Sequence, residues 1–263
     1  MPNQILAFSL PKIAETEKNN QDRFAKSLDG SLIALSDGAG SSLYPRKWAK
    51  LLVKAFCSFA DNPIESINNS YQQWLEPVQE QWRQHYLAKI TNPNRQWWET
   101  DSQTKKCGAA TFLGLNLSHP NWEVAPTGKW LAVAVGDSCL FKLAKEQEQD
   151  KLSAFPLGNS DQFKSTAQCW SSLPEHASFP PQFQTGCYER GDIFLLATDA
   201  LSQWLLADFE SQSQEWKQIF ALERQEDFVQ VIERLRQKKL IKNDDTTAIL
   251  IKIIDKVPIS PIL

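Results

Sequence analysis

The stretch Leu32–Gly40, with the sequence LIALSDGAG, joins a short apolar run to an acid and two glycines. An apolar run of this length, bounded by turn residues, is typical of a strand that is buried on both faces of its sheet. The glycines let the backbone turn sharply and approach a ligand closely. We therefore expect Asp37 to lie at the rim of a sheet, where other acids could meet it.

Composition limits the possible functions of the chain. Of its 263 residues, 42% are hydrophobic and 22% are charged, which is typical of a globular protein. The net charge of −3 gives no basic field, so we expect no nucleic acid among the partners. We see no signal peptide and no apolar stretch near the roughly 18–20 residues of a membrane span, and we therefore expect a cytoplasmic protein without a membrane partner. The five cysteines and three histidines show no metal-binding or disulfide spacing.

Periodicity places helices and strands around this stretch. Apolar spacings of three and four predict a helix over 45–59 and a second over 63–86, which Pro77 should kink or split near Glu76. Strands are predicted at 5–10, 110–117, 130–135, 139–143, 193–197 and 248–254, a loop at 91–106 and a last helix around 228–235. The remaining segment, 145–187, is charged and then rich in proline, and it predicts a flap-like excursion. We expect one domain over 1–257 and a short tail over 258–263.

Acids stand at the boundaries of four predicted strands. Three of these strands end at Asp37, Asp137 and Asp199, and the last strand begins after Asp244. If the last strand runs antiparallel to a neighbour among the others, these acids lie at one edge, and Asp22 adds a carboxylate from near the chain start. Each acid alone also fits an ordinary turn, so the prediction depends on their joint placement.

Carboxylates that converge repel one another, and a cation must offset their charge. Oxygen ligands without histidine or cysteine favour Mg²⁺ or Mn²⁺ over zinc. Paired divalent ions of this kind typically activate water against a phosphate ester. The acids therefore favour a site for hard divalent cations, of the kind that acts on phosphate esters.

Six short motifs occur in a fixed order from about residue 5 to residue 254. They are Asn20-Gln21-Asp22, Ser36–Gly40, Gly108–Thr111, Gly136-Asp137-Ser138, Thr198-Asp199-Ala200 and Asp244–Thr247. This ordered set resembles the metal-dependent protein serine/threonine phosphatases of type 2C (the PPM family). The resemblance implies an α+β fold, a four-layer αββα sandwich of two antiparallel sheets flanked by antiparallel helix pairs. It also implies a phosphorylated protein substrate, and we expect a monomer.

The resemblance further implies a dinuclear Mn²⁺ or Mg²⁺ site. Asp37 would bridge the two ions beside the Gly38 carbonyl, Asp22 would bind one ion, and Asp199 and Asp244 would bind the other. A hydroxide held between the metals would attack the phosphorus of phosphoserine or phosphothreonine, without a covalent phospho-enzyme. Asp37 and Asp22 are therefore the candidate catalytic residues.

The chain departs from the family's pattern at two positions near this site. Glu17 stands five residues before Asp22, where many relatives have an arginine that holds the substrate phosphate; Lys18 is either its replacement or a solvated surface lysine. Gln203 stands where many relatives have a further aspartate for a third ion, so Asp137, the candidate ligand of that ion, lacks its partner and we expect two ions. These departures leave an alternative open, a catalytically weakened relative that binds phosphoproteins or regulates a partner.

Two further features have a predicted role. Asp245 stands where asparagine is common in the family, and we expect it behind the metal ligands rather than among them. Of the ten tryptophans, Trp97, Trp98, Trp122 and Trp170 fall in predicted loops. They mark either a contact surface or side chains tucked under the loops.

Overall fold

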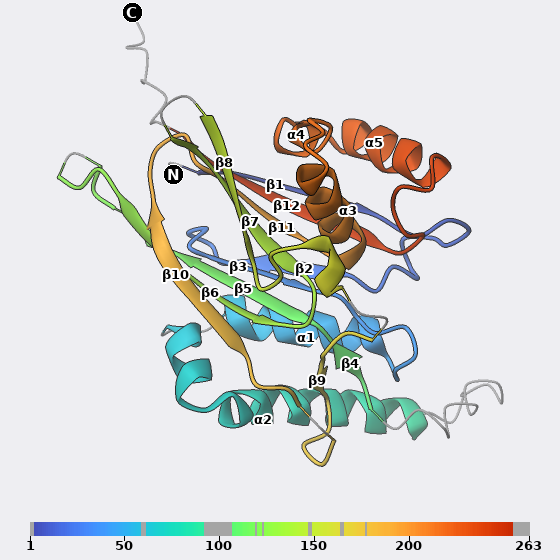
Figure 1. Ribbon diagram of the computed structural model, residues 1–263. Coiled ribbons are helices and arrows are strands. Elements are labelled where there is room, and N and C mark those ends of the chain that lie inside the picture. The colour runs from blue at the N-terminus through green and yellow to red at the C-terminus, as the bar shows by residue number, and fades with distance from the viewer. Residues whose placement is uncertain are drawn as a thin grey trace, which may run out of the picture.

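The computed structural model describes most of the chain. The described residues are 3–58, 62–91, 107–118, 120–122, 124–146, 149–163, 166–176 and 178–254. Two five-stranded antiparallel sheets lie face to face at the centre, and helices cover the outer side of each (Figure 1). This arrangement confirms the predicted α+β sandwich.

The first sheet has the strand order β1-β12-β11-β7-β8. Its strands are β1 (Asn3–Leu10), β12 (Thr246–Ile253), β11 (Ile193–Ala197), β7 (Cys139–Glu146) and β8 (Gln149–Phe155). Helices α3 (Asp199–Glu210), α4 (Lys217–Phe220) and α5 (Gln225–Gln237) pack on its outer face. In this layer Phe228 of α5 stacks on Phe8 of β1, with 5.6 Å between the ring centroids.

The second sheet has the order β10-β6-β5-β3-β2. Its strands are β10 (Gln182–Tyr188), β6 (Gly128–Val135), β5 (Phe112–Leu117), β3 (Leu32–Ser36) and β2 (Arg23–Lys26). Helices α1 (Pro45–Cys57) and α2 (Pro63–Ile90) cover its outer face, and a small ribbon joins β4 (Ala109–Ala110) to β9 (Trp170–Ser171). None of the described helices, including the 28-residue α2, is apolar enough over sufficient length to cross a bilayer.

Strand β3 is buried on both faces, as predicted. Ile33 and Leu35 pack in the core between the two sheets, whereas Leu32 and Ala34 belong to the core under α1 and α2. Because both faces of β3 are covered, its sequence is an unbroken apolar run. A half-exposed strand would instead alternate apolar and polar residues. The chain therefore reaches Asp37 from a fixed, fully packed strand.

The turn after β3 lies against the start of α1. A Cβ atom on Gly38 would lie 2.8 Å from the carbonyl carbon of Pro45, so only glycine fits without a backbone shift. The N–H of Thr111 donates to the carbonyl oxygen of Asp37 at 2.9 Å, and the Asp37 N–H donates to the Thr111 hydroxyl at 3.1 Å. These contacts fix the backbone on both sides of the Asp37 side chain.

The break in α2 lies at Ser70 and not near Glu76, so the predicted position was wrong. Ser70 has φ −161° and ψ 101°, while Pro77 lies inside the helix. The Ser70 hydroxyl accepts a hydrogen bond from the Gln73 N–H at 3.3 Å, which is the contact of a helix N-cap. Ser70 therefore starts a second helical segment. In this helix the serine–glutamine spacing of a capping box predicts the position of the break better than the proline does.

The predicted excursion over 145–187 is shorter in the structure. β8 pairs along β7, and β10 pairs along β6, so both ends of this segment belong to the main sheets as edge strands. Most of β10 is exposed, and an exposed edge needs few apolar residues. For this reason the sequence of these strands lacks the regular alternation of apolar residues by which a strand is predicted.

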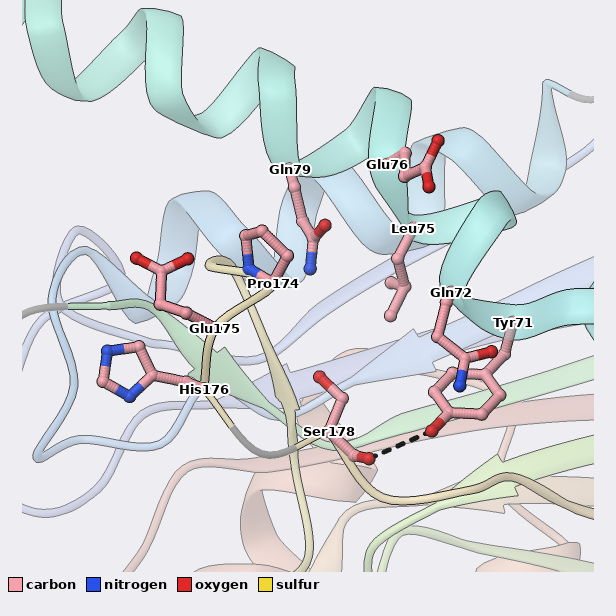
Figure 2. A pocket seen from close by; sticks show the side chains of 9 residues that line it. All are labelled: Tyr71, Gln72, Leu75, Glu76, Gln79, Pro174, Glu175, His176 and Ser178. Atoms are coloured by element: carbon pink, nitrogen blue, oxygen red, sulfur yellow. Dashed lines mark hydrogen bonds between the residues drawn. The ribbon is translucent and has the colours of Figure 1, made fainter.

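The part of the excursion after β9 is fastened to α2. The Tyr71 hydroxyl donates to the carbonyl oxygen of Ser178 at 3.2 Å, and the Gln79 amide donates to that of Ser171 at 3.0 Å. Figure 2 shows the pocket of about 340 Å³ that lies between α2 and this segment, with the contact from Tyr71 to Ser178 at one end. The described residues that line this pocket do not include the acids of the predicted metal site.

Trp170, which was predicted in a loop, is tucked inside. Its side chain is 0% exposed and stacks on Phe112 at 5.0 Å, and its indole N–H donates to the carbonyl oxygen of Phe179. Trp122 is half-buried, and its ring lies under the Arg190 guanidinium. Trp97 and Trp98, most of the predicted loop 91–106 and the predicted tail 258–263 lie outside the described residues.

Candidate metal centre

The sheets bring the predicted acids to one end of the sandwich. β11 and β12 are antiparallel with Ala197 opposite Ala248, so Asp199, just past the end of β11, lies near the start of β12 and Asp244. β11 also pairs with β7, with Ala197 opposite Cys139, which places the turn at Asp137 at the same end. The predicted edge is therefore present in the structure.

The charges of the other four acids act on Asp37. Burial, and then the nearby charges of Asp22, Asp199, Asp244 and Asp137, raise the pKa of Asp37 well above its usual range. The structure thus brings the five acids predicted to hold metal near enough for the charges of the other four to act on Asp37.

The neighbouring carboxylates carry the same electrostatic signature. Burial, reinforced by the charge of Asp245, raises the pKa of Asp22 to about 7. Burial, reinforced by Asp199, raises the pKa of Asp137 to about 6. Burial and the charge of Asp244 also raise the pKa of Asp199. Raised pKa values of this kind show that too little positive charge lies near these carboxylates to stabilise their ionised forms. A bound cation would supply that charge.

Three buried carboxylate oxygens in this cluster have no hydrogen-bond partner. They are the Oδ1 atoms of Asp22, Asp137 and Asp199. Buried polar atoms are nearly always paired, so an unpaired set of this kind indicates a missing ligand. All the donors are oxygen atoms, which suits Mg²⁺ or Mn²⁺. Within the described residues, no three acidic, histidine or cysteine side chains form a group that could hold an ion in their present positions.

Thr198 is a site residue that sequence reasoning missed. It precedes Asp199 at the N-cap of α3, and its hydroxyl donates to Asp22 Oδ2 at 3.2 Å and accepts from the Thr247 N–H at 3.0 Å. Thr198 thereby links two acids that lie 177 residues apart in the sequence. A threonine before a helix is a common cap signal, which could have predicted the position but not the contact with Asp22.

Asp245 lies behind the cluster, as expected. Its two oxygens accept hydrogen bonds from the backbone N–H groups of Lys12, at 3.0 Å, and Gln21, at 2.8 Å. Next to it, Arg236 donates to the carbonyl oxygens of Pro11 and Asp244 at 2.8 and 2.6 Å. Asp245 and Arg236 therefore fasten the segment that carries Asp22 to the start of β12.

The structure places the two departures from the family pattern as follows. Glu17 and Lys18 lie on an exposed loop, whose two carbonyl oxygens accept hydrogen bonds from the Arg46 guanidinium at the start of α1. Gln203 lies one turn after Asp199 on α3 and is half-buried. Lys242 was not singled out from the sequence, yet its ammonium lies 3.7 Å from Asp199 Oδ2.

Comparison with known proteins agrees with this geometry. The sequence model described as Protein phosphatase 2C matches residues 12–242 of the chain. The chain belongs to the protein phosphatase 2C family. This assignment confirms the family predicted from the sequence, and with it the prediction of a protein serine/threonine phosphatase. No curated protein sequence matches the chain at a significant level.

Several solved structures share the fold at low sequence identity. The serine/threonine phosphatase PstP/Ppp of Mycobacterium tuberculosis has a TM-score of 0.63 and 13% identity, and the match covers 96% of this chain and 99% of that one. The catalytic domain of PstP in complex with two manganese ions has a TM-score of 0.60 and 14% identity, covering 96% and 99%. RsbX in complex with magnesium has a TM-score of 0.52 and 17% identity, covering 95% of each chain.

Proposed function

We propose that this member of the phosphatase 2C family hydrolyses phosphoserine and phosphothreonine in proteins at a site that holds two Mn²⁺ or Mg²⁺ ions. The observation that carries the proposal is the convergence of four carboxylates on Asp37, together with three buried carboxylate oxygens that lack partners. Structures of the same fold that contain manganese or magnesium support the choice of metal.

In this proposal each acid has a separate place. Asp37 would hold both ions with help from the Gly38 carbonyl, Asp22 would hold one, and Asp199 and Asp244 would hold the other. When bound, the ions activate a water molecule against the phosphate ester and neutralise the charge that develops on the phosphoryl oxygens.

The surrounding residues keep these acids in position. Thr198 orients Asp22 through its hydroxyl, and the hydrogen bonds of Thr111 fix the backbone of Asp37. Burial of Asp22 limits its contact with bulk water, which strengthens its attraction for a cation.

Lys18 is the proposed contact for the substrate phosphate. Its loop is exposed, and Arg46 holds the loop's backbone at Glu17 and Lys18. An ammonium group attracts a phosphate as a point charge, without the two-pronged geometry of arginine. We therefore expect weaker substrate binding than an arginine at position 17 would give. A cytoplasmic monomer stays a prediction.

The alternative function is a catalytically weakened relative that binds phosphoproteins. Glu17 favours it, because a carboxylate at this exposed position repels a phosphate. Retention of all the acids around Asp37 argues for the enzyme, since a binding module has no need of so many buried carboxylates.

The test compares phosphopeptide hydrolysis by wild type with Mn²⁺, wild type with EDTA, and Asp37→Asn. Asp161→Asn, which changes an exposed aspartate in another segment, is the matched control. We expect metal-dependent turnover by wild type and the control, and loss by at least about a thousandfold in Asp37→Asn. If wild type binds the phosphopeptide but hydrolyses it no faster than Asp37→Asn with either metal, the alternative function replaces the proposal.

A further inference from the structure

Lys242 lies beside the acid cluster, although no motif includes it. It stands two residues before Asp244, on the connection from α5 to β12. Its ammonium nitrogen lies 3.7 Å from Asp199 Oδ2, and its charge acts on both Asp199 and Asp137. Among the described residues, it is the cation that forms an ion pair with one of the five acids of this cluster.

The other nearby cations are directed elsewhere. Arg236 acts electrostatically most strongly on Asp245 and less on Asp244, and its guanidinium donates to two main-chain carbonyl oxygens rather than to a carboxylate. Arg23 likewise donates to the carbonyl oxygens of Asn20 and Asp22 rather than to a carboxylate. Among the described basic side chains near the cluster, Lys242 is thus the one whose charged group pairs with a carboxylate of the metal-binding acids.

With two divalent ions bound, the positive charges of the ions and of Lys242 would equal the negative charges of the acids. The cluster has five carboxylates, and two divalent ions supply four positive charges, which leaves one negative charge. The ammonium of Lys242 supplies the fifth positive charge, close to Asp199 and within electrostatic reach of Asp137. A third divalent ion beside this ammonium would face a like charge at short range.

We propose that Lys242 acts as a fixed cation of the metal centre and limits it to two divalent ions. This inference rests on the proposed function, because it assumes that the acids bind metal. Lys242 is a positioning residue here: it pairs with Asp199, its charge acts on Asp137, and it stands where a further ion would bind. The half-buried Gln203, on the same face of α3 as Asp199, offers a neutral amide in place of another carboxylate.

The test measures Mn²⁺ binding to the metal-free full chain by isothermal titration calorimetry, with free Mn²⁺ followed by electron paramagnetic resonance. The variants are Lys242→Gln, which removes the charge, and Lys242→Arg, which keeps it. Lys50→Gln removes a charge from an exposed position on α1 and serves as the control. Lys242 is 47% exposed, so its replacement should not prevent folding, and circular dichroism checks this.

We expect two Mn²⁺ ions per chain in wild type, Lys242→Arg and Lys50→Gln. Lys242→Gln should bind a third ion, or bind its weakest ion about tenfold more tightly or more, because a like charge has been removed at short range. Equal stoichiometry and affinity in wild type and Lys242→Gln would overturn the inference and leave the proposed function intact. Three ions in wild type would overturn the inference as well. A wild-type chain that binds no Mn²⁺ would overturn the proposed function and this inference together.

Discussion

The carboxylate of Asp245 accepts a hydrogen bond from the backbone N–H of Gln21 at 2.8 Å, which joins the start of the last strand to the residue beside Asp22. The other oxygen of Asp245 accepts from the Lys12 N–H at 3.0 Å, so one side chain holds both ends of this early loop. The position of Asp22 therefore depends on a residue from the opposite end of the chain. A carboxylate that ligates no metal in our proposal still determines whether a ligand is in place.

Asp245→Ala tests this dependence. Two backbone N–H groups would lose a charged acceptor, and each such loss typically costs about 1–3 kcal/mol. We expect a lower free energy of unfolding in urea and an Mn²⁺ affinity at least about tenfold lower than that of wild type. Asp245→Asn retains one acceptor oxygen and should lie between the two proteins. Mn²⁺ binding by Asp245→Ala at wild-type affinity would contradict the role of this carboxylate.

Gly38→Ala tests the contact between the Asp37 turn and α1. The new Cβ atom would lie 2.8 Å from the backbone of Pro45, so either the turn or the helix start must move. We expect a loss of about 1–3 kcal/mol of stability, together with a drop in phosphatase activity, both measured on purified protein. Gly158→Ala is the control, because its Cβ would meet no atom closer than 4.0 Å. Comparable activity of the two variants would show that the turn tolerates displacement.

Trp170→Ala should strongly destabilise the layer between α2 and the second sheet. The indole is fully buried, stacks on Phe112, and contacts Tyr71 and Trp74 through their rings. Truncation of a buried tryptophan typically costs about 3–5 kcal/mol. Urea unfolding followed by circular dichroism measures the loss. Trp170→Phe, which keeps an aromatic ring but loses the N–H donor to Phe179, should cost less than Trp170→Ala; the reverse order would refute the packing role.

Cys57 should make the protein less stable at alkaline pH. Burial raises the pKa of this thiol from 9.0 to about 12, so the folded chain keeps a proton that the unfolded chain loses above pH 9. Stability contributed by this group is complete below pH 9 and falls as the pH rises toward 12, by up to about 1.4 kcal/mol per pH unit. Urea unfolding at pH 8 and pH 10.5 measures the loss. Cys57→Ala should lose less stability than wild type over this interval, and an equal loss in both would show that the thiol does not contribute.

The features that the sequence predicts well are those with a local signal. β3 is an unbroken apolar run that ends before Asp37-Gly38. A run of this kind predicts a strand with both faces buried, and β3 is buried on both faces. The acids at strand ends were predicted to meet because antiparallel strands return to the same edge, and the pairing of β11 with β12 has this geometry.

The features that the sequence hides depend on contacts between distant segments. β10 has mostly exposed residues and is recognised as a strand only by its pairing with β6. Only Thr198 and Asp199 separate the apolar run of β11 from the apolar residues of α3. The sequence therefore gives a weak signal for the start of this helix, and the helix was not predicted. Lys242 has no motif, and only the folded chain brings it to Asp199.

The pairing of β1 with β12 places residues near the two ends of the chain beside each other, with Leu10 opposite Thr246. Asp22 and Asp244 reach the same centre only after this pairing forms. A nascent polypeptide that still has β12 inside the ribosome therefore has an incomplete ligand set, whatever the state of its earlier strands. We expect the chain to remain inactive until β12 has left the ribosome and paired with β1, and chains truncated before Asp244 would show this by failing to bind Mn²⁺.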